Sequence, residues 1–345
     1  MKYRTLGKTG LKVSEVGFGT WQLADGVMWV GATPEESLKC LKEYTELGGN
    51  FIDTAWVYGY LRETGEHASE ELIGKFLKES GKRDKVIIAT KIPPKNFKWP
   101  AWKGVGISEV FPSKHIEQCV NDSLKSLGVE TIDLMQFHVW QDEFSKEDDW
   151  KETIQKLTKV GKVKHWGISI NDYQPSNCLK TLDTGLIATI QLIFNIFHQK
   201  PIERLFPYAR QNNIGLIMRV PLDEGGLTGK FTKDTKFKEG DFRATYFRGE
   251  RLKELVKRTD KLKELLGDEA EDLPELDLRF ILSFGEVSTV IPGMRRLEHV
   301  GKNTKVSDGR KLSKELIEKL KGYFWERNFY EDSDPSMEDT GFIEP

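Results

Sequence analysis

The sequence predicts an α/β protein with a (β/α)8 TIM barrel in a single domain, and the main observation is a regular alternation along the chain. Short β-rich runs recur, and almost every one is followed by a stretch of helical periodicity. Alternation of this kind implies parallel strands joined by right-handed helical crossovers, and eight such units close into a barrel. The length of 345 residues suits one barrel over 1–345 with extended loops, an extra C-terminal helix and an acidic tail over 329–345.

The expected elements follow one another in order. The first helix has the clearest start, because Thr33 can cap it, Pro34 suits its first position and Glu36 its third. Leu38, Leu41 and Leu47 then mark one face of that helix. Strands are expected over 13–21, 50–55, 86–92, 132–139, 163–169, 189–195, 215–222 and 288–293, and the later helices over 69–80, 113–127, 150–160, 177–182, 203–212 and 273–284.

A doubly wound open sheet is the competing architecture, but its dinucleotide fingerprint is missing. Gly17 and Gly19 follow the first β-rich run, and Gln22 stands where the third glycine belongs. The glycine-rich stretch over 225–230 does not have the spacing of a phosphate-binding P-loop. These absences favour the barrel.

Composition excludes several classes of function. The formal net charge is −2, so we expect no nucleic-acid partner and no attraction to an acidic membrane surface. The N-terminus lacks the apolar region of a signal peptide, no stretch approaches a membrane span, and three scattered cysteines suit a reducing compartment. We therefore expect a cytoplasmic protein. No His/Cys/Asp/Glu spacing indicates a metal site, which argues against a metal-dependent barrel hydrolase.

Polar residues end many of the expected strands. In a barrel, residues at the C-terminal ends of the strands face the active-site mouth, and ionisable groups after apolar runs are costly to bury unless they pair. Taken singly, such residues are more often structural, but several of them together indicate a site. The residues at these ends are Asp53, Lys91, His138, Ser169, Gln191 and Arg219.

Tyr58 follows Asp53 by five residues, so the loop can carry it over the same opening. A tyrosine has a free pKa of about 10, and a nearby Lys⁺ favours its phenolate and lowers that pKa. We expect Lys91 to act in this way, with Asp53 holding Lys91 charged and oriented. If a hydride reaches a carbonyl carbon, Tyr58 and His138 can stabilise and protonate the oxygen. The predicted catalytic residues are Asp53, Tyr58, Lys91 and His138.

Ordered motifs make the sequence similar to the aldo-keto reductases over nearly the whole chain. The motifs are GFGTW, FIDTAWVYG, IIATK, IDLMQFH, GKVKHWGIS, IQLIFN, PLDEGGLTGKF and IPGMRR. The resemblance implies the catalytic tetrad Asp53, Tyr58, Lys91 and His138. It also implies NADP(H), or less often NAD(H), bound across the barrel mouth without a Rossmann fold.

The resemblance also implies the residues that contact the cofactor. The family often has Ser and Asn adjacent, whereas here Ile170 separates Ser169 from Asn171. Arg295 can fork onto a 2′-phosphate, which favours NADP(H), although the family's frequent Lys-Ser pair is Gly293-Met294 here. The implied contacts are Gly19, Thr20, Trp21, Asp53, Ser169, Asn171, Gln191, Arg219, Pro221, Leu222, Gly225, Leu227, Lys230, Gly293, Arg295, His299 and Asn303.

Arg219 is the main departure from the family, which usually places an aromatic residue there to stack on the nicotinamide. A guanidinium is planar and can also stack, and its charge disfavours the cationic oxidised nicotinamide. We hypothesise that Arg219 biases the protein toward carbonyl reduction. The alternative is a salt bridge from Arg219 to Asp223 or Glu224.

A long connection over 95–111 can supply the walls of a substrate pocket. Its aromatic residues either line an apolar pocket or pin a surface loop to the barrel. The predicted substrate pocket consists of Trp56, Trp99, Trp102 and Trp140. The acidic tail over 329–345 either caps this pocket or is disordered.

The sequence therefore predicts an NADP(H)-dependent oxidoreductase that reduces a small-molecule aldehyde or ketone to the alcohol, with Tyr58 as general acid. A second function fits the same residues, because some relatives keep the tetrad and serve as cofactor-sensing regulatory subunits of a membrane channel. The particular carbonyl compound and the oligomeric state do not follow from the sequence.

Overall fold

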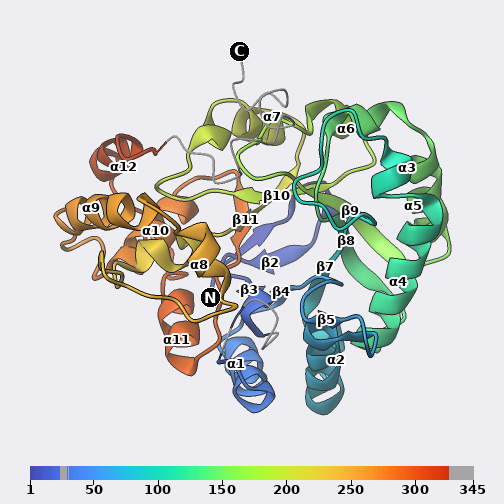
Figure 1. The fold of residues 1–345 in the computed structure, drawn as a ribbon, viewed down its shortest axis with the longest axis horizontal. Coiled ribbons are helices and arrows are strands. Elements are labelled where there is room, and N and C mark those ends of the chain that lie inside the picture. The colour runs from blue at the N-terminus through green and yellow to red at the C-terminus, as the bar shows by residue number, and fades with distance from the viewer. Residues whose placement is uncertain (24–28, 30, 326–345) are drawn as a thin grey trace.

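The computed structural model describes residues 1–23, 29 and 31–325, and in it parallel strands lie inside a ring of helices (Figure 1). Eight strands form one sheet in the order β12-β11-β10-β9-β8-β7-β4-β3, and every pair in it is parallel. These strands are β3 (Phe18–Gly19), β4 (Phe51–Asp53), β7 (Ile87–Ile92), β8 (Ile132–Phe137), β9 (Val163–Ser169), β10 (Thr189–Ile193), β11 (Gly215–Arg219) and β12 (Val287–Val290).

The sheet closes on itself between its first and last strands. Parallel bridges join Val16 to Val290 and Gly19 to Gly293. The amide of Gly17 donates to Val290 O over 2.8 Å, which continues the ladder across the seam. Closure leaves no open sheet edge, and the predicted (β/α)8 barrel is confirmed.

Helices alternate with the strands close to the predicted places. Thr33 caps the first helix as expected, because its hydroxyl accepts from Glu36 N over 3.2 Å. The helices that follow the strands are α1 (Pro34–Glu46), α2 (Ala68–Ser80), α4 (Ser113–Leu127), α5 (Asp149–Lys159), α6 (Leu179–Asp183), α7 (Leu205–Gln211), α10 (Leu273–Leu282) and α11 (Leu297–Lys305). Further helices are α3 (Ile107–Val110), α8 (Phe242–Tyr246), α9 (Arg251–Lys263) and α12 (Lys314–Lys321).

Two local expectations differ from the structure. The run over 13–21 is not one strand: its first part forms β2 (Lys12–Ser14), which pairs with β1 (Tyr3–Thr5), and only β3 enters the barrel. Strand propensity alone does not specify the pairing partner, so the sequence could not separate the two. Leu47, expected on the buried face of α1, follows the last turn of that helix and is 41% exposed.

The hairpin of β1 and β2 covers the N-terminal end of the barrel. Leu6 and Val13 are fully buried in one cluster with Phe51 and with residues near the starts of other strands. Gly7 has a φ of +50°, and a Cβ added there would lie 2.1 Å from Gly215 N, so only glycine fits this contact. The barrel is therefore sealed at this end, and a site can open only at the other. A two-stranded ribbon, β5 (Tyr60–Leu61) with β6 (Glu66–His67), follows β4 at that other end.

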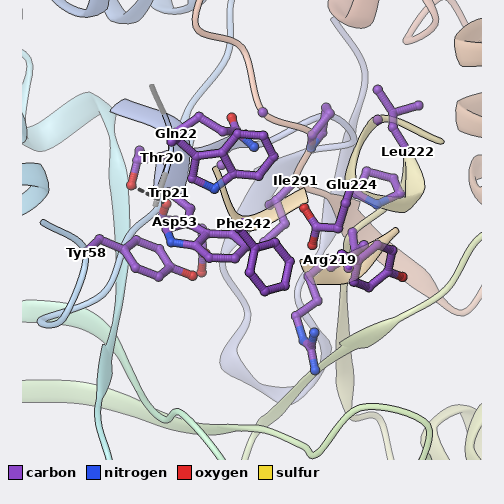
Figure 2. A pocket seen from close by; sticks show the side chains of 18 of the residues that line it. Thr20, Trp21, Gln22, Asp53, Tyr58, Arg219, Leu222, Glu224, Phe242 and Ile291 are labelled. Atoms are coloured by element: carbon purple, nitrogen blue, oxygen red, sulfur yellow. Dashed lines mark hydrogen bonds between the residues drawn. The ribbon is translucent and has the colours of Figure 1, made fainter. Parts of the chain in front are cut away.

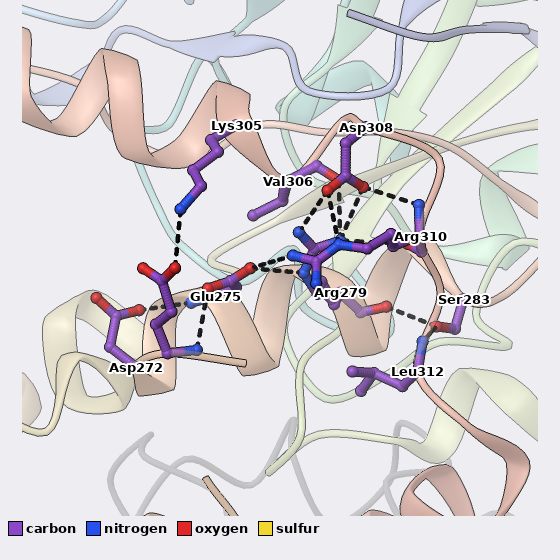
Figure 3. A network of polar contacts seen from close by, with 10 residues as sticks. Asp272, Glu275, Arg279, Ser283, Lys305, Val306, Asp308, Arg310 and Leu312 are labelled. Carbon is purple, nitrogen blue, oxygen red and sulfur yellow. Dashed lines mark hydrogen bonds and ion pairs between the residues drawn. The ribbon is translucent and has the colours of Figure 1, made fainter. Parts of the chain in front are cut away.

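A charged network fixes α10 to the segment after α11 (Figure 3). Arg279 is 1% exposed, and its guanidinium donates to Glu275 Oε1 over 2.8 Å and to both oxygens of Asp308 over 3.0 and 2.9 Å. Arg310 also donates to Asp308. The network satisfies a buried guanidinium completely and ties together two helices next to the cavity described below. The predicted tail over 329–345 lies outside the described residues, and the assignment of 1–345 to one domain stays a prediction.

Candidate active site

A cavity of about 1290 Å³ opens at the C-terminal ends of the strands. Its walls come from the ends of β3, β4, β8, β9, β10, β11 and β12 and from the loops that follow them. Figure 2 shows side chains from several of these elements facing one another, among them Thr20, Asp53, Tyr58 and Arg219. The chain therefore gathers segments far apart in sequence at one opening, where barrel enzymes have their active sites.

Asp53, Lys91 and Tyr58 meet at one side of this cavity. Lys91 is fully buried, and its ammonium group donates to Asp53 Oδ1 over 2.5 Å and to Thr54 O over 2.8 Å. Tyr58 OH lies 3.5 Å from Lys91 Nζ. Gln191 donates to the other oxygen of Asp53 over 2.7 Å. The carboxylate is thus held from both sides, and it keeps the ammonium group beside the phenol.

The pKa of Tyr58 differs in direction from the sequence-based expectation. Burial raises the pKa of Tyr58 above its ordinary value, and the charge of Asp53 acts in the same direction. The charge of Lys91 lowers the pKa of the phenol but does not offset the loss of hydration. The expectation of a lowered pKa was therefore wrong, because the sequence could not show how deeply the hydroxyl is enclosed. At neutral pH Tyr58 carries its proton.

His138 faces the same phenol. Its ring lies 5.7 Å from the ring of Tyr58, and Trp99 approaches it edge-on at 5.8 Å. Burial, Lys91 and Arg219 hold the pKa of His138 well below its ordinary value, so the imidazole is neutral. Its Nδ1 atom is buried and has no hydrogen-bond partner among the described residues. A buried polar atom without a partner is costly, and it indicates a place prepared for a ligand.

Arg219 ends β11 and pairs with Asp172, in the loop after β9. Its Nη2 atom donates to Asp172 Oδ1 in a very short contact and to Ile170 O over 2.9 Å. Among the ion pairs of the described residues, Arg219 pairs with Asp172 and not with either predicted alternative, Asp223 or Glu224. Asp223 is instead fully buried and accepts from Tyr246 OH over 2.9 Å.

Most of the residues predicted to contact a cofactor line the cavity. The exception is Leu227, which is fully buried in the core. Asn171 lines the cavity, but its side chain is engaged by Ala101 and Gln174, so it positions the loop over 95–111. The predicted residues in the lining are Gly19, Thr20, Trp21, Asp53, Ser169, Asn171, Gln191, Arg219, Pro221, Leu222, Gly225, Lys230, Gly293, Arg295, His299 and Asn303.

Only Trp99 of the four predicted tryptophans lines the cavity. Trp140 is fully buried, donates to Thr181 Oγ1 over 2.8 Å and packs edge-on against Trp150, so it belongs to the core. Trp56 faces α4, where its indole N–H donates to Asp122, and Trp102 lies under Lys98. Aromatic character alone did not reveal which side of the wall each ring faces.

The sequence analysis assigned no contact with the cofactor or substrate to several residues that line the cavity. Phe242, in the insertion between β11 and α10, packs on Trp21 with ring centroids 5.1 Å apart. Arg243 lies 5.0 Å above the ring of Trp29. Gln22 and Glu224 also line the cavity. The only available signal was their position beside predicted contacts, such as Glu224 within PLDEGGLTGKF.

Within the described residues, no helix combines the length and the apolar character that crossing a bilayer requires. No group of three or more His, Cys, Asp or Glu side chains in this part of the chain is arranged to hold a metal ion.

Comparison with known proteins decides the family. The model of the aldo/keto reductase family matches residues 15–323. The chain belongs to this family. It is 31% identical over 299 residues to the aldo-keto reductase YhdN of Bacillus subtilis, with 86% of each chain covered. It is 28% identical to a probable voltage-gated potassium channel subunit beta of Arabidopsis thaliana, covering 89% of this chain and 92% of the relative.

The fold comparison agrees with the family. The solved aldo-keto reductase AKR11C1 from Bacillus halodurans, in its holo form, superposes with a TM-score of 0.73 at 25% identity, covering 96% of this chain and 99% of that one. This aldo-keto reductase is therefore an oxidoreductase whose family acts on small carbonyl compounds with a nicotinamide cofactor.

The residues present fit such a cofactor. Several buried polar atoms in the lining, among them His138 Nδ1 and Gln22 Oε1, have no hydrogen-bond partner among the described residues. Gly19 lines the cavity at the seam of the barrel, where a Cβ would lie 2.7 Å from Ile291 O, so a larger residue does not fit there. The cavity also has both a cationic part, with Lys230 and Arg295, and an apolar aromatic part. An extended dinucleotide with phosphate groups matches this combination.

Proposed function

We propose that this chain is an NADP(H)-dependent reductase of aldehydes or ketones in which Tyr58 is the general acid. The observation that carries the proposal is the meeting of the Tyr58 hydroxyl, the Lys91 ammonium group and the neutral His138 ring at one wall of the cavity. The bound cofactor supplies a hydride to the carbonyl carbon. The protein then has to bind and protonate the carbonyl oxygen.

Tyr58 is suited to protonate that oxygen. Because burial keeps its pKa raised, the phenol holds a proton until a stronger base, the developing alkoxide, appears beside it. The phenolate left behind lies 3.5 Å from Lys91 Nζ, and the ammonium charge stabilises it. Asp53 keeps Lys91 in place, and solvent in the cavity returns a proton to Tyr58 after the alcohol leaves.

His138 is suited to bind the carbonyl oxygen. A neutral imidazole has one N–H donor, and this ring lies against both Tyr58 and Trp99. The ring of Trp21 stacks on the ring of Tyr58 with centroids 6.0 Å apart, and Phe242 packs on Trp21. The aromatic surroundings favour an apolar or aromatic carbonyl compound and exclude water from the reacting atoms.

The other part of the cavity bears on the choice of dinucleotide. Lys230 and Arg295 line it, and cations of this kind favour the 2′-phosphate of NADP(H). Asp272 and Glu298 line it as well, and carboxylates favour the ribose hydroxyls of NAD(H). We therefore expect a preference for NADP(H) with measurable use of NAD(H).

The test follows the absorbance of NADPH with a panel of aliphatic and aromatic aldehydes and ketones. We expect turnover with several of them and the fastest turnover with aromatic ones. A protein that binds NADPH but oxidises it negligibly with every carbonyl would contradict the proposal. That result would instead support the second function, a cofactor-sensing regulatory subunit, which the likeness to the probable channel subunit beta favours.

A further inference from the structure

Glu224 is a cavity residue that the proposed mechanism does not use. It belongs to the short 3-10 segment Asp223–Thr228, directly after Pro221 and Leu222. Figure 2 shows its carboxyl group among the side chains that face the cavity. Neither a hydrogen bond nor an ion pair holds this carboxyl group within the described residues. A carboxyl group in such a position is aimed at whatever fills the cavity.

The backbone around Glu224 is held in an unusual conformation. Asp223, Glu224 and Gly225 have φ values of +48°, +54° and +94°, and Val220 has +52°. Left-handed conformations at residues other than glycine are unfavourable and persist only where surrounding contacts enforce them. The conformation sends two neighbouring carboxylates in different directions, with Asp223 into the protein and Glu224 into the cavity.

Specific contacts enforce this conformation. Asn195 Nδ2 donates to Val220 O over 2.9 Å, and the amide of Leu227 donates to Leu222 O over 3.1 Å. Tyr246, at the end of α8, donates to Asp223 Oδ1 over 2.9 Å. A contact within the loop and two other parts of the chain, at Asn195 and Tyr246, thus fix its conformation, so Glu224 is presented by a rigid support.

The charged groups around Glu224 do not form an ion pair with it among the described residues. Asp223 on its own segment and Asp172 in the loop after β9 face it with the same sign. Arg219 on β11 and Arg243 on α8 face it with the opposite sign, but Arg219 is bound to Asp172 and Arg243 to Asp241. Burial, together with the two aspartates, raises the pKa of Glu224 to about 8.

We propose that Glu224 binds the dinucleotide as a neutral carboxylic acid that donates a hydrogen bond to one of its oxygens, so that binding above neutral pH takes up one proton. This inference rests on the proposed function, because it requires a dinucleotide in the cavity. An ionised carboxylate would repel the phosphate charges of that ligand, whereas the neutral acid is a hydrogen-bond donor. Neighbouring Arg219 and Arg243 keep their own carboxylate partners in either state.

Three other ionisable side chains in the cavity have pKa values shifted away from the range between pH 7 and 9. His138 and His299 have pKa values lowered by burial, and the pKa of Tyr58 is raised above 10. The second pKa of a phosphate monoester is about 6. Asp277 does not line the cavity, but burial raises its pKa well above the ordinary value, so it is a second carboxyl group that could take up a proton. It therefore serves as the control position.

The experiment measures the dissociation constant of NADPH by its fluorescence from pH 7 to 9.5. We expect the affinity of the unaltered protein to fall about tenfold per pH unit above the pKa of Glu224, as one-proton linkage requires. Glu224→Gln keeps a neutral donor of the same shape and should make the affinity independent of pH. Glu224→Ala should weaken binding about two- to tenfold at pH 7, the effect of one lost hydrogen bond.

A flat profile for the unaltered protein would overturn the inference, and so would an unchanged slope in Glu224→Gln. The control Asp277→Asn should keep the slope, and if it abolishes the slope, the proton belongs to Asp277 and the inference is wrong. Calorimetry in two buffers of different ionisation enthalpy should show uptake of one proton at pH 8.5. If neither NADPH nor NADH binds at any pH, the proposed function fails too; if they bind with a flat profile, this inference alone fails.

Discussion

The two ends of the barrel are built from the same strands, yet they carry opposite chemistry. Near the N-terminal end, Phe51, Ala89 and Ile217 join the buried cluster under the hairpin. Two residues later on the same strands stand Asp53, Lys91 and Arg219. Residues two apart on a strand point to the same side. The apolar layer of Phe51, Ala89 and Ile217 is therefore followed, two residues along the same strands, by the layer of Asp53, Lys91 and Arg219.

This difference shows how the apolar end supports the polar end. The ion pair of Asp53 and Lys91 is almost completely buried, and a buried pair is costly unless its remaining atoms are satisfied. Thr54 O and the side chain of Gln191 satisfy them. The apolar cluster lies below the pair, and Tyr58 OH lies 3.5 Å from Lys91 Nζ on the side of the cavity. We expect changes at the two ends to separate activity from stability.

Tyr58→Phe should give the largest effect, and it should act on activity alone. Without the hydroxyl no general acid reaches the carbonyl oxygen, so kcat should fall about 10²- to 10⁴-fold. The dissociation constant of NADPH and the melting temperature should stay nearly unchanged. Steady-state kinetics, fluorescence titration and thermal unfolding measure the three quantities. A loss of less than tenfold in kcat would remove Tyr58 from the role of general acid.

Leu6→Ala should give the opposite pattern. Leu6 is fully buried under the barrel, and truncation of a buried leucine costs about 2–5 kcal/mol of unfolding free energy. The kcat of the folded protein should change less than twofold, because the cavity is at the other end. Denaturant unfolding and active-site titration measure the two effects. A large fall in kcat would mean that the two ends are coupled more tightly than the contacts indicate.

Gly293→Ala should weaken cofactor binding about tenfold, a moderate effect confined to the cavity. A Cβ at this position would lie 1.7 Å from Gln22 Oε1, so the side chain of Gln22 has to move. The matched control is Gln22→Ala, in which the clash is absent. Adding Gly293→Ala to Gln22→Ala should cost little further affinity, and a double-mutant cycle of dissociation constants measures this coupling. Additive losses would show that Gln22 and Gly293 act independently.

Arg219→Tyr should give the smallest effect, about two- to threefold in the ratio of the dissociation constants of NADP⁺ and NADPH. Removal of the positive charge favours the cationic oxidised nicotinamide, but Asp172 already offsets most of that charge. Asp172→Asn leaves Arg219 unopposed and should shift the ratio in the opposite direction. Equal shifts for both forms of the cofactor would refute an effect of charge.

Local sequence patterns predicted the strands of the barrel and the helices between them. Asp53 and Lys91 lie at or next to the ends of β4 and β7, His138 directly follows β8, and parallel strands place such ends together. The N-terminal cap of α1 and the bounds of α4 and β9 also follow from local patterns. Local patterns do not specify depth, however, and so the expected direction of the Tyr58 pKa was wrong.

The sequence by itself thus determined the barrel and the order of its strands, because these depend on periodicity and on chain order. Only the tertiary structure decided that Arg219 pairs with Asp172, that Trp140 lies in the core and that Glu224 faces the cavity. These outcomes depend on contacts between loops distant in sequence. No local pattern predicts that Glu224 faces the cavity while its neighbour Asp223 is buried.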